Sequence, residues 1–536
     1  MASAGRRRSA NTVQRRAATG DRDDDWQRIT SEAIVDSTNF LDNAPEDRKY
    51  RYRITAPGGS VSETVEVDAS AEATMLALDI PLNPDDAPPK TGIALGELCN
   101  DGRIGYVLRV IRGKTIRMLA YGHDGRALWE IDTKLSPVGG WDGSTLHAPM
   151  LCWDVNGDGR TEVIFRRDKT ATGKLEYEGT GPDETMVAVD AETGQVVWER
   201  PWPGGATREN ITVGHLRGMD QPASVVLLDG TYGDEVLTAI AGESGEISWR
   251  VEQARPAGHN LDIGDIDGDG VQEVICGGIC YNGDGTIRWE AEPFGHTDIS
   301  KPARIDPNRD GLQIWYAVES GNPGVYFVDN KGRTIFKEQY HHAHYGWLAR
   351  HTAEIPGLQP HTAEDARRSG QWGTEEKHRE MATLGHFPIF LPDGSHWGNL
   401  TDWQRKNFVP VHWDAGSQVV FIIRNENKHI VRLRDDGQIE DLPEAKLPEV
   451  GEYGRNLACA DVIGDFRENI VTYDAKEHRL MVLVNPTVCN VRGYSPYDDF
   501  HYRHDRSQHG SGYYIYLSAP DTVVNRLGYN RFFIKR

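Results

Sequence analysis

The feature that most constrains the fold is a short repeat in which a glycine precedes a tryptophan by four positions. An alternating apolar run ends in a turn residue just before each copy, so each repeat predicts a hairpin with a tight turn. The copies are GRALW (125–129), GQVVW (194–198), GEISW (245–249), GTIRW (285–289) and the variant GRTIF (332–336). Self-similarity at this spacing is typical of repeat architectures, propellers among them.

Each repeat also has an inner half, in which an apolar strand leads through an Asp-rich turn into a second apolar strand. Examples are MLCWDVNGDGRTEVIF, LDIGDIDGDGVQEVICGG and ARIDPNRDGLQIWYAV. With a divergent repeat near 346–400, we count eight units. This divergent repeat contains a polar, helix-leaning insertion at 357–383, so a count of seven units is the alternative. We therefore expect an all-β chain that folds into a single β-propeller of seven or eight blades.

The repeats divide the chain into three parts. Residues 91–536 are expected to form the propeller and to carry any active site. Residues 28–90 predict a short β extension that packs on it. Residues 1–27 are basic and then acidic without an apolar core, and we expect them to be disordered.

The charge balance narrows the choice of partners. The chain carries 59 Lys and Arg against 81 Asp and Glu, a net charge of -22. A body of this charge repels nucleic acid and anionic membrane surfaces. An anionic ligand therefore needs a local basic site. The six cysteines lie mostly in apolar runs, which indicates buried thiols.

Two Asp-rich turns have the spacing of an oxygen-only cation site. Oxygen-bearing side chains stand at the first, third, fifth and ninth positions of each turn, with glycine at the bend, which suits calcium. An Asx-type turn whose carboxylates bind only backbone N–H groups is the alternative. The residues are Asp154, Asn156, Asp158 and Glu162 in one turn, and Asp265, Asp267, Asp269 and Glu273 in the other.

The order of strands in a four-stranded blade assigns every loop to a face. The Asp-rich turns and the glycine turns lie on one face, and the loops between the second and third strands and between blades lie on the other. The second face receives His, Tyr and Arg from separate repeats. Convergence of these residue types at the mouth of a propeller is the sequence signal for a binding or active site.

The chain resembles the propeller polysaccharide lyases, a group that includes rhamnogalacturonan, ulvan and rhamnose-glucuronate lyases. The resemblance is carried by HAPMLCWDVNGDGRTEV, GHNLDIGDIDGDGVQEVICGG, GHTDISKPARIDPNRDGLQIW, ADVIGDFREN and FHYRHDRSQHGSGY. It implies β-elimination at a uronic acid in a polysaccharide that also contains rhamnose. That reaction requires a cation to neutralise the carboxylate, a base and an acid.

We assign these roles to residues of the second face. Arg208 is the candidate neutraliser, because a guanidinium pairs bidentately with a carboxylate. His147 is the candidate base or acid, since imidazole titrates near neutral pH. Tyr177 or Tyr232 would supply the remaining proton step.

Other residues of that face are candidates for binding. His259, His296, Trp202 and Tyr345 could contact sugars. Alternatively His259, Cys280, His296 and His342 could hold zinc, whose favoured ligands are imidazole and thiolate. Structural calcium and a possible zinc are thus the expected cofactors.

Two other function classes remain open. One is a non-catalytic, calcium-dependent carbohydrate-binding propeller, since such proteins carry similar Asp-rich turns. The other is a quinoprotein oxidoreductase, because VDAETGQVVWERP resembles a repeat of that family. As a lyase, the chain is expected to act as a monomer on an anionic polysaccharide, in an extracellular or periplasmic location.

Overall fold

The computed structural model describes residues 10–508, with short gaps and three long ones at 136–147, 169–182 and 365–387, together with residues 533–534. Regular structure in this part of the chain is almost entirely strand, which confirms the all-β prediction. The described helical elements are α2 (Phe500–Ser507) and the 3-10 turn η5 (Pro496–Asp498).

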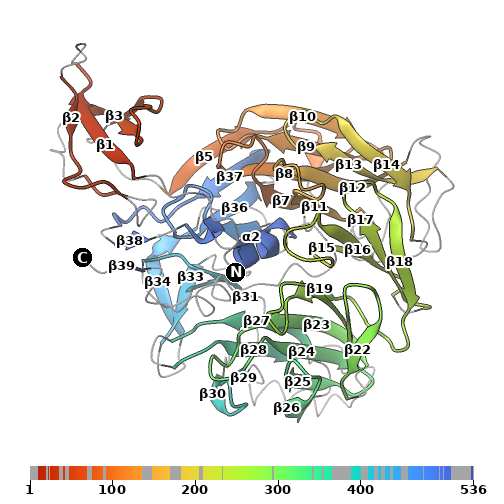
Figure 1. Cartoon of the computed structure of the whole chain (residues 1–536). Helices are drawn as coiled ribbons and strands as arrows, with labels where there is room; N and C mark the ends of the chain where they lie inside the picture. The colour runs from red at the N-terminus through yellow and green to blue at the C-terminus, as the bar shows by residue number, and fades with distance from the viewer. Residues whose placement is uncertain are drawn as a thin grey trace.

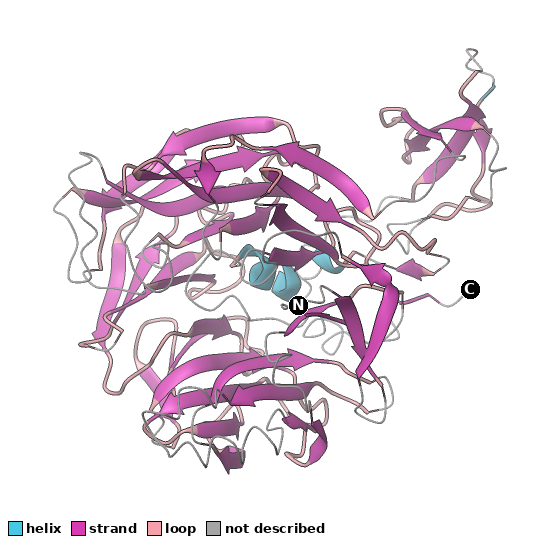
Figure 2. Ribbon diagram, turned by 180° about the vertical axis from the view of Figure 1, so that it is seen from behind, coloured by secondary structure: helices cyan, strands magenta, loops and turns pink. Residues whose placement is uncertain are grey.

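A four-stranded sheet at the N-terminus stands apart from the rest in Figures 1 and 2. Its strands run in the order β2-β1-β3-β4. They are β1 (Thr12–Ala17), β2 (Gln27–Arg28), β3 (Lys49–Thr55) and β4 (Val65–Asp68). Residues 12–17 lie in the segment that we expected to be disordered, and their pairing with β3 is what orders them.

Eight further sheets follow around a common centre (Figure 1), and within each one neighbouring strands are antiparallel. The first contains β6 (Asp86–Ala87), β7 (Ile93–Gly96), β8 (Gly105–Arg112), β9 (Thr115–Tyr121) and β10 (Ala127–Asp132). The second contains β11 (Met150–Trp153), β12 (Glu162–Asp168), β13 (Glu184–Asp190) and β14 (Val196–Pro201). The third contains β15 (Asn210–Gly214), β16 (Ser224–Asp229), β17 (Val236–Ala241) and β18 (Ile247–Glu252).

The next three sheets have the same four-stranded order. The fourth contains β19 (Leu261–Gly264), β20 (Glu273–Cys276), β21 (Ile279–Tyr281) and β22 (Ile287–Glu290). The fifth contains β23 (His296–Ala303), β24 (Gln313–Ser320), β25 (Gly324–Val328) and β26 (Thr334–Gln339). The sixth contains β27 (Ala343–Ala349), β28 (Gln359–Glu364), β29 (Pro388–Phe390) and β30 (His396–Asn399).

The last two sheets use strands from both ends of the chain. The seventh contains β31 (Phe408–Val411), β32 (Val420–Ile423), β33 (His429–Leu433) and β34 (Ile439–Lys446). The eighth contains β35 (Leu457–Ala460), β36 (Asn469–Asp474), β37 (Arg479–Leu483) and, from the N-terminal part, β5 (Leu76–Pro81). A separate pair joins β38 (Arg492–Gly493) to β39 (Phe533–Ile534).

Strand β28 corrects one expectation. It occupies the start of the predicted insertion at 357–383, because residues 359–364 pair with β27 instead of forming a helix-leaning loop. Residues 365–383 lie outside the described part of the chain.

The repeated glycine and tryptophan join successive sheets. The indole of one repeat packs on the turn glycine of the next, where an added Cβ would lie 2.6–2.9 Å from an indole atom and φ is +71° to +84°. Only glycine fits such a position without strain. The indole N–H also donates to a backbone carbonyl of the next sheet. The packing pairs are Trp129 on Gly194, Trp198 on Gly245, Trp249 on Gly285 and Trp289 on Gly332, with N–H bonds to Ala191, Gly242, Gly283 and Asn330.

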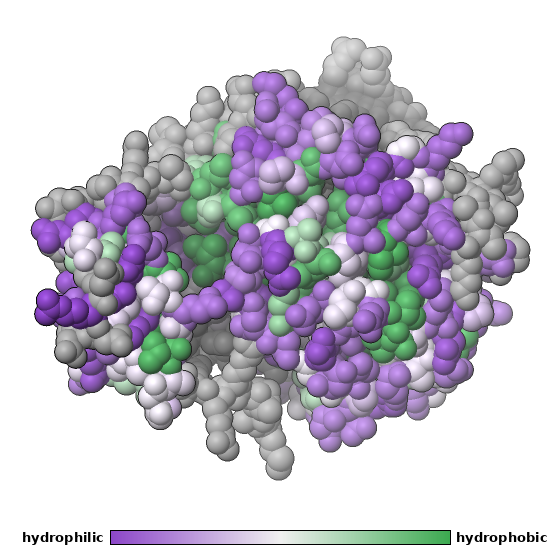
Figure 3. Space-filling view, turned by 90° about the horizontal axis from the view of Figure 1, so that it is seen from above, coloured by the Kyte–Doolittle hydropathy of each residue, from purple (hydrophilic) through white to green (hydrophobic). Residues whose placement is uncertain are grey.

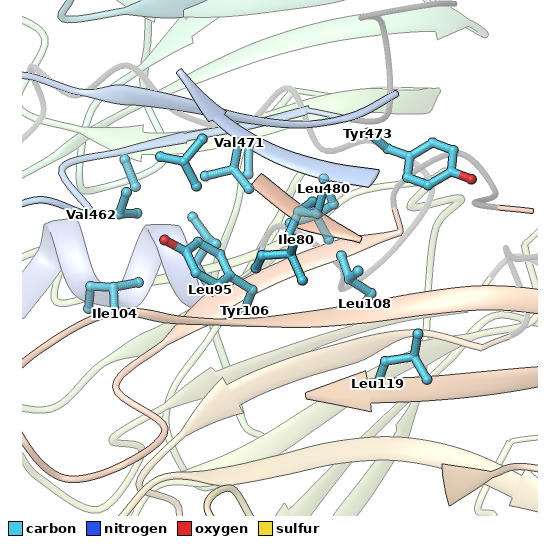
Figure 4. Close-up of a cluster of buried hydrophobic side chains, with 14 of the residues drawn as sticks. Ile80, Leu95, Ile104, Tyr106, Leu108, Leu119, Val462, Val471, Tyr473 and Leu480 are labelled. Atoms are coloured by element: carbon cyan, nitrogen blue, oxygen red, sulfur yellow. The ribbon is translucent and has the colours of Figure 1, made fainter. Parts of the chain in front are cut away.

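Strand β5 links the first and last sheets. It pairs with β37, and Ile80 faces Gly125 of the first sheet, the position that an indole takes elsewhere. Figure 4 shows Ile80 among side chains of both sheets, with Leu480 and Val471 on one side and Leu95 and Leu108 on the other. Burial of this cluster holds residues from the two ends of the chain together.

Helix α2 lies at the centre of the eight sheets in both ribbon views (Figures 1 and 2). Its Asp505 accepts a 2.7 Å ion pair from Lys301 of β23, and its Arg506 pairs at 2.7 Å with Glu468, just before β36. The ring of His504 hydrogen-bonds the Val213 carbonyl of β15. One helix thus bonds three sheets that are far apart in sequence.

The face drawn in Figure 3 is largely hydrophilic, with smaller hydrophobic areas between the polar ones. Among the described residues no helix has the length and apolarity that a membrane span would need. All six cysteines are free thiols, four of them buried, as their apolar sequence context predicts.

Candidate functional site

Two histidines and two carboxylates meet at the start of β23. His259, His296, Asp298 and Glu319 are buried, and one ligand atom from each lies within 4.8 Å of the others. The two imidazole rings meet edge to face with centroids 4.5 Å apart. Nε2 of His296 lies 3.3 Å from Oε2 of Glu319 and 3.7 Å from Oδ1 of Asp298.

Antiparallel pairing brings these residues together. His296 opposes Ser320 in the register of β23 with β24, which places Glu319 beside it, and the turn joining these strands lies at their opposite end. His259 precedes β19, and its N–H donates to the Thr297 carbonyl at 3.0 Å. The site thus lies on the face that the loop assignment predicted for His259 and His296.

The backbone before His259 is held in one conformation. Gly258 has φ +82°, and a Cβ there would lie 2.2 Å from the Thr297 carbonyl oxygen, so no other residue fits. The buried carboxylate of Glu235 accepts hydrogen bonds from the N–H groups of Ala257 and Gly258. The amide of Asn210 donates to the His259 carbonyl from the neighbouring sheet.

The donor set is suited to a divalent cation. Two imidazole nitrogens and two carboxylate oxygens are ligands of first-row divalent metals, and carboxylates also serve calcium. Asp298 and Glu319 were absent from the sequence prediction. Asp298 follows His296 by two residues, a spacing that could have pointed to it, whereas only the strand register identifies Glu319.

Of the zinc set predicted from sequence, the structure brings His259 and His296 together but not Cys280. Cys280 is fully buried in β21, opposite Ile275 and Trp289, in a different cluster from the two histidines. Burial raises the pKa of its thiol well above the ordinary range, which disfavours the thiolate that a metal needs. His342 lies outside the described residues.

The two Asp-rich turns lie at the opposite ends of the inner strands. In the second turn, carboxylate oxygens of Asp265, Asp267 and Asp269 come within 4.8 Å of one another. Arg288 pairs with Asp267 and, at 2.9 Å, with Glu273. Asp265 also accepts three backbone N–H bonds, at 2.7–3.1 Å, so the loop has Asx-type bonding together with a carboxylate cluster.

The first turn has similar bonding. Asp154 accepts N–H bonds from Gly157 and Gly159 at 2.8 and 2.9 Å, and Asn156 and Asp158 bond within the loop. Glu162 accepts the N–H of Val155 at 3.0 Å. Burial raises the pKa of Glu162 to about 7, and burial does the same for Glu273 of the second turn.

Trp202 does not lie on a sugar-binding surface. Its indole is 6 % exposed within a hydrophobic cluster, and its N–H donates to Glu209 at 2.8 Å. The guanidinium of Arg166 lies 4.8 Å from its ring and pairs with Glu184 and Glu209. Sequence reasoning missed this network because its members come from different strands.

The remaining predicted residues cannot be compared with the structure. His147, Arg208, Tyr177 and Tyr232 lie outside the described residues. Tyr345 belongs to β27, and its side chain lies outside them as well. Their assignments remain predictions.

Comparisons with known proteins agree with the sequence resemblance. The profile of the rhamnogalacturonan lyase family 11 C-terminal domain matches residues 212–516. The rhamnogalacturonan exolyase YesX of Bacillus subtilis (strain 168) is 26% identical, over 86% of this chain and 84% of its own length. The rhamnogalacturonan endolyase YesW of the same organism is 24% identical, over 57% of each chain.

Solved structures show the same fold. The YesX structure superposes with a TM-score of 0.74 at 19% identity, covering 96% of this chain and 91% of that one. The YesW structure gives a TM-score of 0.72 at 18% identity, covering 95% and 90%. The match to the family profile extends over more than half of the chain. This protein therefore belongs to the rhamnogalacturonan lyase family 11 and is a polysaccharide lyase.

Proposed function

We propose that the protein cleaves the rhamnogalacturonan backbone, in which rhamnose alternates with galacturonate, by β-elimination at the galacturonate. A base takes the C5 proton, the electron pair forms a C4=C5 double bond, and the C4–O4 bond breaks. An acid protonates the departing oxygen, leaving an unsaturated uronate. The observation that carries this proposal is the buried group of His259, His296, Asp298 and Glu319 in a member of this lyase family.

We also infer that the eight sheets are the blades of a single closed propeller. The support is that β5, from before the first blade, supplies the outer strand of the last one. Its Ile80 meets Gly125 as the tryptophans meet the other turn glycines. In such a closed propeller, the inner strands of all blades begin at one mouth of the central channel. The calcium-type turns lie at the opposite mouth.

The sequence-predicted catalytic residues fit this mouth by their positions in the chain. Arg208 lies two residues before the start of β15, and His147 precedes β11, as His259 precedes β19. Tyr177 and Tyr232 fall between second and third strands, the end at which Glu319 lies. We assign Arg208 to the uronate carboxylate, His147 to one proton transfer and a tyrosine to the other.

His259, His296, Asp298 and Glu319 would hold a divalent cation at this mouth. When bound, it would supply positive charge to the uronate carboxylate and so favour loss of the C5 proton. The burial of these four side chains keeps bulk water from the carboxylates. The two Asp-rich turns are proposed as structural calcium sites. An extracellular or periplasmic location is proposed because the substrate is a polymer.

The test is the rise in ultraviolet absorbance of an unsaturated uronate when the protein meets rhamnogalacturonan, with homogalacturonan and ulvan as comparison polymers. We expect product from rhamnogalacturonan alone, and about 10²–10⁴-fold less in His147→Ala. Sizing of the products separates terminal from internal cleavage. Binding without any unsaturated product would refute the proposal in favour of a binding propeller.

A cation assay tests the mouth separately. Chelation followed by addition of zinc, manganese or calcium identifies which ion restores activity. Glu319→Gln should raise the concentration of that ion needed to restore activity, whereas Asp267→Asn, in the turn at the other end of the inner strands, should leave that concentration unchanged. Equal effects of the two variants would contradict the assignment.

A further inference from the structure

The N-terminal sheet has two faces of different charge character. Partners in the register of β1 with β2 and β3 share a face, since cross-strand neighbours point the same way. Arg28, Gln14 and Arg53 form one row across three strands, and Arg16 opposes Arg51 in the next. We call the four arginines of these rows, with Trp26, the arginine face.

Trp26 orders two of these guanidiniums. The guanidinium carbon of Arg16 lies 4.7 Å from the Trp26 ring centroid, and that of Arg53 lies 4.3 Å away. Nε of Arg53 also donates to Oε1 of Gln14 at 2.6 Å. Stacking on an indole fixes a guanidinium plane while leaving its N–H edges available for a carboxylate.

The described ion pairs of this face lie at its β4 edge. Arg51 pairs with Glu66 at 3.1 Å, and Lys49 with Asp68 at 3.7 Å, both on the β4 side. Among the residues that the structure describes, no ion pair involves Arg16, Arg28 or Arg53. On the β2 side, these three described guanidiniums are therefore not neutralised by a described ion pair.

The opposite face of the sheet differs. There the guanidinium of Arg15 pairs with Asp42 at 2.7 Å, and the hydroxyl of Tyr52 donates to the same carboxylate at 2.8 Å. That arginine is neutralised within the fold and serves stability. The contrast indicates that the charge of the arginine face is available to a ligand.

We propose that the arginine face is a secondary binding site for the uronate chain of the substrate. Arg28 and Arg53 lie two strand spacings apart, about 10 Å, which is on the scale of a disaccharide. Guanidiniums at that separation suit a polymer with a carboxylate on every second sugar. In a chain of net charge -22, such a face supplies the basic site that a polyanion needs.

The sheet stands apart from the helix that marks the centre of the ring (Figure 1), so it does not take part in the chemistry. It holds a long polymer near the enzyme and raises the local concentration of cleavable bonds. Short oligosaccharides that fill only the active site gain nothing from it. This inference rests on the proposed function, because it takes a polyuronate as the substrate.

The test uses the full-length protein and fully de-esterified polygalacturonate as the probe, with affinity electrophoresis or calorimetry as the readout. Arg16→Gln combined with Arg53→Gln should weaken binding about tenfold and make its salt dependence shallower. Arg28→Gln removes an exposed side chain and should give a smaller loss in the same direction. Turnover of short oligosaccharides should stay at the wild-type rate in both variants.

Two controls distinguish binding at the arginine face from a general effect of the protein's net charge. Arg200→Gln with Arg217→Gln removes two exposed ring arginines, each paired with one glutamate, and should leave binding within about twofold. Methyl-esterified polygalacturonate should not bind the wild type. Equal weakening by the ring variant, binding of the ester, or no binding of polygalacturonate would overturn the proposal. Failure of the proposed function appears separately, as no unsaturated product from rhamnogalacturonan.

Discussion

Lys301 is the clearest point at which to test how α2 is held in the ring. Its ammonium lies 3.0 Å from Asp262 of β19 and 2.7 Å from Asp505 of α2, and all three side chains are at most 8 % exposed. Burial lowers the pKa of Lys301 while the two carboxylates raise it, and the net direction is upward. Lys301 is therefore charged in the folded state across the neutral range.

Lys301→Met should destabilise the protein strongly. The substitution removes the cation between two buried carboxylates, and breaking a buried pair in this way costs about 3–5 kcal/mol. Asn at both Asp262 and Asp505, combined with Lys301→Met, should recover part of the loss because no buried charge is left uncompensated. The free energy of unfolding in urea, followed by tryptophan fluorescence, measures both effects.

Lys337→Met is the matched control. Lys337 pairs with Glu292 at 2.7 Å, the same distance, but its side chain is 52% exposed. Its loss should leave the unfolding midpoint nearly unchanged, because solvent screens an exposed pair. If Lys301→Met lowers the free energy of unfolding no more than Lys337→Met does, then burial does not determine how much the Lys301 ion pairs stabilise the protein, and the prediction is refuted.

Three further predictions concern pH, backbone fit and ring closure. Burial raises the pKa of Glu209 to about 8 from an ordinary 4.5, so the folded state holds a proton that the unfolded state has released, and stability falls as pH rises through that window. The free energy of unfolding of Glu209→Gln should therefore rise relative to that of wild type between about pH 5 and pH 8, by at most about 1.4 kcal/mol per pH unit, and a constant difference would contradict this. Gly258→Ala should abolish cation binding beside His259 and turnover, whereas Gly268→Ala, which has the same φ of +82° but open space around it, should retain turnover. Removal of residues 1–74 should leave a folded ring, and removal of residues 1–82, which includes β5, should not; equal near-ultraviolet circular dichroism of the two would contradict closure by β5.

The repeats allowed much of the architecture to be predicted from sequence. The glycine and tryptophan spacing indicated successive hairpins, and the structure shows why, since Trp129 needs the bare backbone of Gly194. Strand order then assigned His259 and His296 to one face and the Asp-rich turns to the other. These inferences rest on local periodicity, which the sequence carries directly.

Other features depended on contacts that local periodicity does not encode. Trp202 was expected to stack on a sugar, but its N–H donates to Glu209 and its ring contacts Arg166, both from other parts of the chain. Cys280 looked like a ligand, but its strand turns it into an apolar cluster. In both cases the prediction used the chemistry of the side chain, but the direction in which that side chain points depends on the tertiary structure.

The sequence by itself determined the strand repeats, the division into two faces and the resemblance to polysaccharide lyases. Only the tertiary structure decided that Asp298 and Glu319 join the two histidines, that Lys301 binds α2, and that Trp26 orders two arginines. The physical reason is that a site is a set of distances between residues far apart in the chain. Strand register and the packing of one sheet against the next set those distances.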